Sequence, residues 1–286
     1  MGVDVEAFFH AATSTITYLV SEPRSKQAAI IDSVLDFDPA SGRAETRSAE
    51  ALADHIEKRA LQVAYIFETH VHADHLTAAQ YLKERLGGRI GIGAEVSKVQ
   101  KSFGAAMNAG SEFKTDGSQF DILLGDDDGL PLGDQEITIM QTPGHTPACV
   151  TYLVDSFAFV GDTIFMPDMG SARCDFPDGC ARRLFHSIGR ILALPPETRI
   201  LVGHDYGPGG REIAWQTTVA EQLRDNIHVK AGSREEDFVK MRRARDATLG
   251  MPRLLLPSVQ VNMRAGALPP PEDNGVSYLK LPVNQF

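Results

Sequence analysis

Cysteine, tryptophan and long apolar runs are scarce in this sequence of 286 residues, which has three cysteines and one tryptophan. The cysteines, Cys149, Cys174 and Cys180, are too few and too irregularly spaced for a disulfide framework or a zinc knuckle. No apolar run approaches the roughly 20 residues of a membrane-spanning helix. Residues 1–10 contain no basic stretch followed by an apolar one, so no signal peptide is expected. These absences favour a reducing, cytoplasmic location.

Basic residues are in the minority, with 28 lysines and arginines against 38 acidic residues and a formal net charge of −10. A net-negative surface repels phosphate backbones and anionic lipids, which argues against nucleic acid and membranes as partners. An anionic small substrate would need a local group of arginines. With 43% hydrophobic and 23% charged residues, the composition is that of an ordinary folded protein.

Apolar periodicity and turn residues predict strands that alternate with helices. Strands are expected at residues 14–20, 28–32, 63–67, 89–92, 137–141, 150–154, 157–160 and 199–202. Helices are expected at residues 49–59, 76–86, 182–193, 212–226 and 235–247. The segment 259–262 has a strand-like pattern, and the proline-rich tail, 267–286, is expected to be an extended arm. This alternation predicts one domain of layered α/β class with its core at about residues 12–266.

Three of the nine histidines fall within six residues, in the sequence Thr69-His70-Val71-His72-Ala73-Asp74-His75. This stretch follows a predicted strand and precedes a predicted helix, where α/β proteins place their sites. Imidazole is the commonest protein ligand for borderline metals, and one turn fixes the directions of several rings. A polar helix N-terminus would explain Asp74 but not the three histidines. The cluster therefore predicts a metal site.

Later fragments repeat this context, with a polar residue directly after an apolar strand. The residues are His145 in Thr142–Pro147, Asp162 in Phe159–Thr163 and His204 in Leu201–Tyr206. Gly161, just before Asp162, lets the backbone approach a neighbour closely. Each fragment alone is a weak signal, because a single histidine in a turn is usually a surface residue. Together with the first cluster, they predict one metal site on a rim where four strands end.

The other polar features are interpreted as structural rather than as metal-binding or catalytic. The triple aspartate at 126–128 lacks the spaced ligands and closing glutamate of a calcium loop, which favours a solvated turn. The remaining histidines, assigned to surface or packing positions, are His10, His55, His186 and His228. Cys174 and Cys180 have no base beside them in the sequence and are interpreted as small buried residues rather than as nucleophiles.

The series His70-Val71-His72-Ala73-Asp74-His75, followed by His145, Asp162 and His204, resembles the metallo-β-lactamase superfamily. The pattern spans about half of the chain, from Thr69 to Tyr206. The resemblance implies an αββα sandwich with the metal at one edge. Within the superfamily, the sequence is most similar to the persulfide dioxygenases, the ethylmalonic encephalopathy protein group. The fragments that carry this closer similarity are Gly144–Pro147, Ser171–Phe176, Glu236–Lys240 and Asn262–Arg264.

The resemblance implies an enzyme that oxidises glutathione persulfide with dioxygen to sulfite and glutathione. One iron(II) per chain would be bound by His70, His145 and Asp162, leaving coordination positions open for persulfide sulfur and dioxygen. Four further residues would orient these ligands or hold a second metal: His72, Asp74, His75 and His204.

Substrate binding is expected at Arg173 and Tyr206, because glutathione carries two carboxylates. The alternative for Arg173 is a structural salt bridge to Asp175. The proline-rich arm, 267–286, is also compatible with contact to a second subunit, so a homodimer is left open.

The main alternative is a binuclear zinc hydrolase of glutathione thioesters, of the glyoxalase II kind. It would use the same cluster, with Asp162 bridging two zinc ions. Such enzymes have a helical C-terminal region. The strand-like pattern at 259–262 therefore favours the dioxygenase.

Overall fold

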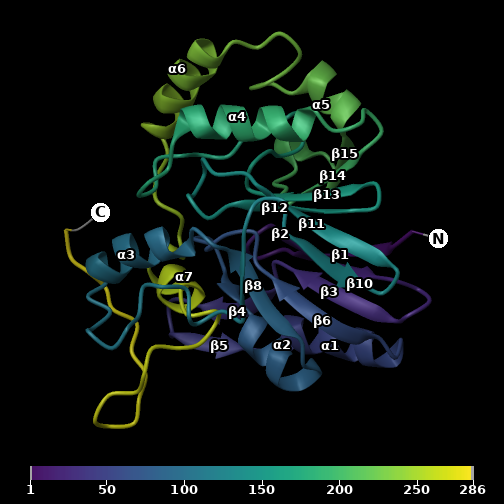
Figure 1. Ribbon diagram of the computed structural model, residues 1–286. Coiled ribbons are helices and arrows are strands. Elements are labelled where there is room, and N and C mark those ends of the chain that lie inside the picture. The colour runs from purple at the N-terminus through teal and green to yellow at the C-terminus, as the bar shows by residue number, and fades with distance from the viewer. Residues whose placement is uncertain (1, 285–286) are drawn as a thin grey trace.

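The computed structural model describes residues 2–284, and its centre is a pair of stacked β-sheets (Figure 1). The first sheet has the strand order β1 (Asp4–His10), β2 (Thr15–Ser21), β3 (Gln27–Ile31), β6 (Gln62–Phe67), β8 (Arg89–Gly93) and β9 (Ile122–Leu124). The second has the order β10 (Gly129–Leu132), β11 (Gln135–Gln141), β12 (Val150–Val154), β13 (Phe157–Gly161), β14 (Arg199–Val202) and β15 (Gln216–Thr218). A small third sheet joins β5 (Arg43–Glu45), β4 (Val34–Asp38) and β7 (Leu76–Thr77).

Helices cover the outer face of each sheet (Figure 1). The first sheet carries α1 (Arg47–Lys58), α2 (Ala79–Leu86), α3 (Val96–Ala106) and α7 (Leu255–Asn262). The second carries α4 (Ala181–Leu192), α5 (Val219–Asp225) and α6 (Glu235–Asp246). In α4, Leu184, Ile188 and Ile191 recur at helical spacing and are fully buried against the second sheet. The architecture is therefore the expected αββα sandwich.

Aromatic side chains fill the space between the two sheets. Phe67 of β6 stacks on Tyr152 of β12, with ring centroids 4.5 Å apart. Tyr18 of β2 meets Phe159 of β13 edge to face at 5.2 Å. Both tyrosine hydroxyls are used: Tyr18 donates to the Val202 carbonyl at 2.6 Å, and Tyr152 donates to the Glu68 carbonyl at 2.8 Å. These bonds tie the two sheets together where their strands end.

Strand direction brings the ends of several strands to one edge of the sandwich. β13 runs parallel to β14, and β11 and β13 are both antiparallel to β12. The carboxyl ends of β11, β13 and β14 consequently share an edge. In the other sheet β3, β6 and β8 run parallel. The turns that follow β6, β11, β13 and β14 contain the predicted site residues.

Two of the secondary-structure predictions are wrong. Residues 259–262 are not a strand but the second half of α7, where burial on several sides outweighs the β-branched Val259 and Val261. Of the residues predicted as a helix at 212–226, only the last part is helical and forms α5. The first part is irregular and then forms β15, since the Asp205 carboxylate accepts the Ala214 N–H at 2.7 Å.

The helix predicted at 76–86 begins only at Ala79, because Leu76 and Thr77 pair with β4 as β7. Seven strands (β1, β4, β5, β7, β9, β10 and β15) and the helix α3 were not predicted. Most of these strands have only two to five residues, too short for a distinct alternation, whereas α3 does carry Val96, Val99 and Phe103 at helical spacing, a signal that was overlooked.

The C-terminal arm has no helix or strand between residues 267 and 284, as expected for an extended segment; residues 285–286 of the predicted arm lie outside the described part. It runs along α3 and α7 and projects from one corner of the molecule (Figure 1). Gln260 of α7 anchors it by donating to the Lys280 carbonyl at 2.9 Å and accepting the Lys280 N–H at 2.8 Å.

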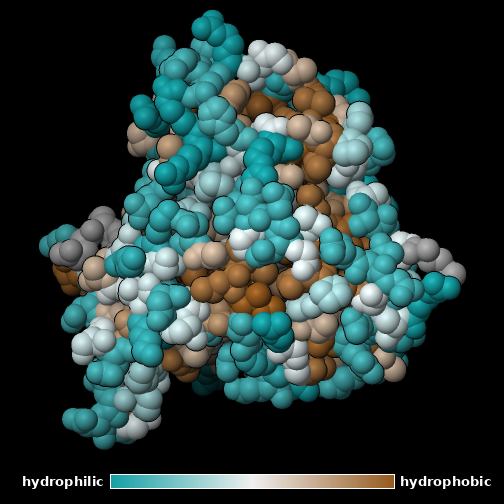
Figure 2. All heavy atoms as spheres, viewed as in Figure 1, coloured by the Kyte–Doolittle hydropathy of each residue, from teal (hydrophilic) through white to brown (hydrophobic). Residues whose placement is uncertain are grey.

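The faces of the molecule differ in polarity. Figure 2 shows polar residues over α4 and α6 and along the arm, and apolar residues gathered around the sheets in the middle of the same view. Within residues 2–284, no helix has the length and apolar character needed to cross a membrane.

We predict that Tyr152→Phe lowers the free energy of unfolding by about 1–2 kcal/mol, because it leaves the buried Glu68 carbonyl without its donor. The measurement is chemical denaturation followed by circular dichroism. Tyr278→Phe is the control, because Tyr278 is 44% exposed on the arm. Its effect should stay within about 0.5 kcal/mol. Equal effects of the two substitutions would contradict the cross-sheet role of Tyr152.

Candidate metal centre

The turn after β6 is held by the buried carboxylate of Asp32, which follows β3. Asp32 accepts the Thr69 N–H at 2.7 Å and the Thr69 hydroxyl at 2.8 Å. Its Oδ1 also lies 3.0 Å from Nε2 of His72. Burial alone would raise the pKa of Asp32, but the charge of His72 and the hydrogen bonds from His72 and Thr69 lower it. One carboxylate thus fixes both ends of the segment Thr69–His72.

The same turn is also held from the C-terminal part of the chain. Asn262, at the end of α7, donates from Nδ2 to the carbonyls of His72 at 2.9 Å and His75 at 2.7 Å. Its Oδ1 accepts the Thr77 N–H at 2.9 Å. The side chain is only 3% exposed. Both polar atoms of the Asn262 side chain therefore form hydrogen bonds with the backbone of the histidine-rich turn and the residues just after it.

His145 lies in the turn between β11 and β12. Its Nδ1 donates to the Arg173 carbonyl at 2.7 Å, which leaves Nε2 with a lone pair. Gly144 has φ +150°, and a Cβ at this position would overlap the backbone of Leu184 in α4. The glycine thus lets the turn lie directly on the start of the helix.

Asp162 follows β13, and the residue before it, Gly161, lies directly against Thr69. Gly161 has φ +49°, a left-handed conformation, and a Cβ there would overlap the Thr69 hydroxyl. This is the close approach that the sequence predicted for Gly161. A Cβ at Gly203, after β14, would lie 2.9 Å from Oδ1 of Asp162. Small residues therefore let the turns of both sheets meet around this carboxylate.

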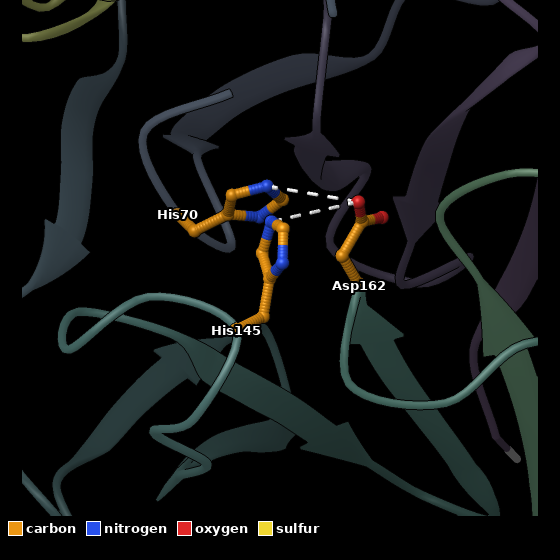
Figure 3. A group of neighbouring side chains, drawn as sticks. All are labelled: His70, His145 and Asp162. Atoms are coloured by element: carbon orange, nitrogen blue, oxygen red, sulfur yellow. Dashed lines mark ion pairs between the residues drawn. The ribbon is translucent and has the colours of Figure 1, made fainter. Parts of the chain in front are cut away.

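His70, His145 and Asp162 converge on one point (Figure 3). The Asp162 Oδ2 atom lies 4.0 Å from Nε2 of His70 and 3.8 Å from Nε2 of His145. The three possible ligand atoms all lie within 4.8 Å of one another. These three residues, which are far apart in the sequence, therefore meet at one place as predicted.

The polar atoms of this group fit a metal ion. Nε2 of His70 and Oδ1 of Asp162 are buried and have no hydrogen-bond partner within residues 2–284. Burial, followed by the neighbouring His72 and His145 rings, holds the pKa of His70 well below its usual value. The His70 ring is therefore neutral at pH 7 and has a lone pair to donate. Buried polar atoms without partners are costly, and a cation held by Oδ2 of Asp162 would satisfy Nε2 of His70, whereas Oδ1 of Asp162 faces His204.

A second group lies beside the first. One ligand atom from each of His72, Asp74 and His75 also falls within a 4.8 Å limit. His204 joins the two groups, because its Nε2 lies 3.4 Å from both Asp74 Oδ2 and Asp162 Oδ1. All four residues predicted to accompany the ligands are therefore at the site.

A third group, Asp32, Glu68 and His72, was not found from the sequence. Nε2 of His72 lies 3.0 Å from Oε2 of Glu68 as well as from Asp32. Although burial alone would lower it, these two carboxylates raise the pKa of His72 well above its usual value. Asp32 and Glu68 each follow an apolar strand, so the pattern that identified Asp162 would have found them too.

The site opens into a cavity of about 450 Å³ whose wall includes His145 and Asp162. Arg173 and Tyr206 both line it, as expected of substrate-binding residues. The Arg173 guanidinium, however, is bound to both oxygens of Asp175, at 2.6 and 2.7 Å, and to the Gly250 carbonyl. The salt bridge considered as the alternative for Arg173 is thus present.

The sequence analysis missed three further arginines on the cavity wall: Arg242, Arg245 and Arg253. Arg242 is fully buried and pairs with Asp246 at 2.6 Å. Arg245 and Arg253 are exposed, and neither side chain forms a hydrogen bond or ion pair within the described part of the chain. They lie on and just after α6, in a region without a strand-end pattern.

Comparison with known proteins agrees with this site. The model of the Metallo-beta-lactamase superfamily matches residues 14–204, which include all of the clustered histidines and aspartates. A "Probable metallo-hydrolase" of Burkholderia pseudomallei is 57% identical, covering 98% of this chain and 99% of that protein. "Glyoxylase B2" of Dictyostelium discoideum is 47% identical, covering 98% and 97%. The chain spans 64% of the length of the "Beta-lactamase hydrolase-like protein" of Agrobacterium fabrum, at 51% identity.

The chain belongs to the metallo-β-lactamase superfamily, whose members include metal-binding enzymes. Within it, the chain falls in the group similar to ETHE1. "Persulfide dioxygenase ETHE1, mitochondrial" of Homo sapiens is 31% identical, covering 92% of this chain and 88% of that protein. The crystal structure of ETHE1 from Myxococcus xanthus has a TM-score of 0.73 at 28% identity, covering 92% of this chain and all of that one.

We predict that Gly161→Ala abolishes stable metal binding. Alanine in a left-handed conformation costs about 1–2 kcal/mol, and its Cβ would push Thr69 away from Asp162. The control is Gly189→Ala in α4, where an added Cβ has open space. That change should raise stability by up to about 1 kcal/mol and leave the metal content unchanged. Metal analysis of both purified variants decides, and full occupancy in Gly161→Ala would contradict the account.

We also predict that Asn262→Ala reduces metal retention at least tenfold, because the backbone of the histidine-rich turn loses three hydrogen bonds. Gln260→Ala is the matched control on the same helix, since Gln260 holds only the arm and the Leu256 carbonyl. Dialysis against a chelator followed by metal analysis separates the two. Equal metal loss from both variants would show that α7 acts only through general stability.

Proposed function

We propose that this protein is a persulfide dioxygenase, which oxidises glutathione persulfide with dioxygen to sulfite and glutathione at one iron(II). The observation that carries the proposal is the convergence of His70, His145 and Asp162, with unpartnered buried ligand atoms, at the floor of an open cavity. Two imidazoles and one carboxylate are the ligand set of mononuclear iron(II) oxygenases. The similarity to ETHE1 supports the choice of substrate.

In this proposal the iron supplies open coordination positions at which sulfur and dioxygen can react. The chain supplies the orientation. The Arg173 carbonyl holds the Nδ1 proton of His145, so that Nε2 faces the centre. Thr69 contacts Nδ1 of His70 at 3.0 Å and, through Asp32, fixes the direction of that ring. Phe176 packs edge to face against His145 and shields it from water.

Substrate carboxylates would be bound by Arg245 and Arg253 in addition to the predicted Tyr206. Both guanidinium groups line the cavity without ion partners in the described residues, whereas that of Arg173 is already neutralised by Asp175. Glutathione has two carboxylates, which match two free cations. Arg173 then serves mainly through its backbone carbonyl.

A binuclear zinc hydrolase of glutathione thioesters is the second candidate, and specific observations favour it. His72, Asp74 and His75 form a second ligand group, and "Glyoxylase B2" is a relative at 47% identity. Residues 259–262 are helical in α7, so the strand-like pattern there no longer favours the dioxygenase. His72 does not decide between the two candidates, because Asp32 and Glu68 engage its Nε2 and leave Nδ1, which is buried without a partner among the described residues, available to a metal.

The deciding experiment compares two reactions of the wild-type protein, loaded anaerobically with iron(II) or with zinc. Oxygen uptake is measured with glutathione persulfide, and thioester cleavage is measured with a glutathione thioester. The dioxygenase predicts oxygen uptake by the iron form with one iron per chain, and negligible cleavage. Thioester cleavage by a form with two zinc ions, without oxygen uptake, would establish the hydrolase instead.

We predict that Asp162→Ala abolishes iron retention and oxygen uptake while the protein stays folded, because this carboxylate serves the centre and not the core. Arg245→Ala and Arg253→Ala should raise KM for the persulfide by roughly tenfold each, the loss expected from one charged hydrogen bond of about 1.5 kcal/mol. Arg243→Ala, exposed on α6 and absent from the cavity wall, is the control. Unchanged KM in both cavity variants would refute the assignment of the carboxylate sites.

A further inference from the structure

The C-terminal arm forms a loop at residues 268–276 that projects from the body of the molecule (Figure 1). Within this projecting loop, the Gly275 N–H donates to the Glu272 carbonyl at 2.8 Å, and the Glu272 N–H donates to the Val276 carbonyl at 3.0 Å. These bonds close a turn, and the Gln260 side chain anchors the segment that returns to the body. The projecting loop is therefore ordered before it meets a partner, which lowers the entropy cost of binding.

The surface of the projecting loop combines apolar and acidic residues. Its exposed apolar residues are Leu268, Pro270, Pro271 and Val276. A proline run has no N–H groups and is already extended, so it can lie against an apolar surface without losing hydrogen bonds or much freedom. The charged residues of the loop, Glu272 and Asp273, directly follow the prolines. Both are exposed, and neither forms an ion pair among residues 2–284.

An apolar groove of about 620 Å³ lies beside the returning segment of the arm. The residues that line it come from β4, the start of α7 and the arm, and the larger apolar ones are Phe37, Met251, Leu255, Leu256, Tyr278 and Leu281. Leu281 is 73% exposed. Phe37 and Tyr278 provide the aromatic lining that is typical of grooves for proline-rich segments. The described part of the chain thus leaves uncovered a surface suited to such a segment.

The groove and the projecting loop carry charges of opposite sign. The charged residues on the wall of the apolar groove are Arg253 and Lys280, and both are cationic. The Lys280 ammonium donates to the Asn108 carbonyl, a neutral partner that leaves its charge in place. Glu272 and Asp273 on the loop complement these two cations. Complementary charge of this kind favours the right partner and fixes its register.

The projecting loop cannot fill the groove of its own chain. Residues 277–282 are part of the groove wall, and they follow the loop directly. To enter the groove, the loop would have to fold back over this wall and break the hydrogen bond between Glu272 and Val276. In two copies related by a two-fold axis, each loop can instead reach the groove of the other copy.

We propose that two copies of this chain associate by placing the projecting loop of each, residues 268–276, in the apolar groove of the other. Every dimer then contains two identical loop-and-groove contacts, as a two-fold axis requires. Pro252 and Arg253 line both this groove and the cavity of the metal centre. The copies therefore meet directly behind one wall of that cavity. This interface goes beyond the proposed function and does not depend on it.

The test determines the mass of the full-length protein in solution by sedimentation velocity over a range of concentrations. The wild type is expected to be a dimer. Reversing the loop charges, with Glu272→Lys and Asp273→Lys in one chain, should raise the dissociation constant at least tenfold, because like charges then meet. Reversing the groove charge with Lys280→Glu should do the same. The anchor to Gln260 survives this change, because it uses only the backbone of Lys280.

Mixing the two charge-reversed variants gives the sharpest result. In a mixed pair, the reversed loop meets the reversed groove and the natural loop meets the natural groove, so opposite charges face each other at both contacts. The mixture is therefore expected to form dimers under conditions in which each variant alone is a monomer. A contact between loop and groove of the same chain, or an interface elsewhere, would not show this recovery.

A pair of apolar substitutions tests the groove itself. Leu281→Ser should weaken the dimer about tenfold, as expected for loss of a buried apolar contact at an interface. Ile227→Ser is the matched control, because Ile227 is 61% exposed and does not line the groove. This control should leave the dissociation constant unchanged. Thermal unfolding and metal analysis of each variant show whether it is folded.

Three results would overturn the proposal. A monomeric wild type would leave the groove to a small apolar ligand or to another protein. A dimer that persists in both charge-reversed variants would have a different interface. Failure of the mixed variants to associate would exclude the exchange of loops. Oxygen uptake is not measured in these experiments, so failure of the proposed function would not affect their outcome.

Discussion

The carboxylate of Asp32 is the constraint on which the metal centre depends. It is buried at the end of β3 and accepts three hydrogen bonds from one turn, two from Thr69 and one from His72. A buried carboxylate is stable only when its oxygens are matched in this way, so the turn has little freedom. With the turn fixed, His70 can point only toward Asp162 and His145. Asp32 does not belong to the proposed ligand set, yet it determines where that set forms.

The centre also depends on elements that are distant in sequence. Asn262 of α7 holds the histidine-rich turn, while Arg242 and Asp246 of α6 hold the segment whose Arg173 carbonyl orients His145. These C-terminal helices lie beyond the matched family region, which ends at residue 204. They therefore form part of the support for the site as well as of the outer layers. Ligand direction is secured in one sheet by the buried side chains of Asp32 and Asn262, and in the other by the backbone carbonyl of Arg173.

The sequence was sufficient for the layers and for the proposed ligands, because strand-end histidines and aspartates such as His145 and Asp162 follow clear apolar runs. It was insufficient where tertiary contacts decide. Val259 and Val261 favour a strand in isolation, yet packing makes them helical. The sequence left Arg173 open between substrate binding and a salt bridge to Asp175, and only the structure shows that the salt bridge forms. The contacts of His10 with Thr13 and Asp36 likewise arise only in the fold.

The most direct test of the central claim is anomalous diffraction at the iron edge from crystals of the anaerobically iron-loaded protein. The account predicts one peak per chain, within bonding distance of Nε2 of His70, Nε2 of His145 and one oxygen of Asp162. Two peaks on either side of Asp162, the second bound by Asp74, His75 and His204, would contradict a mononuclear centre. A single peak away from His70 and His145 would contradict the ligand set itself.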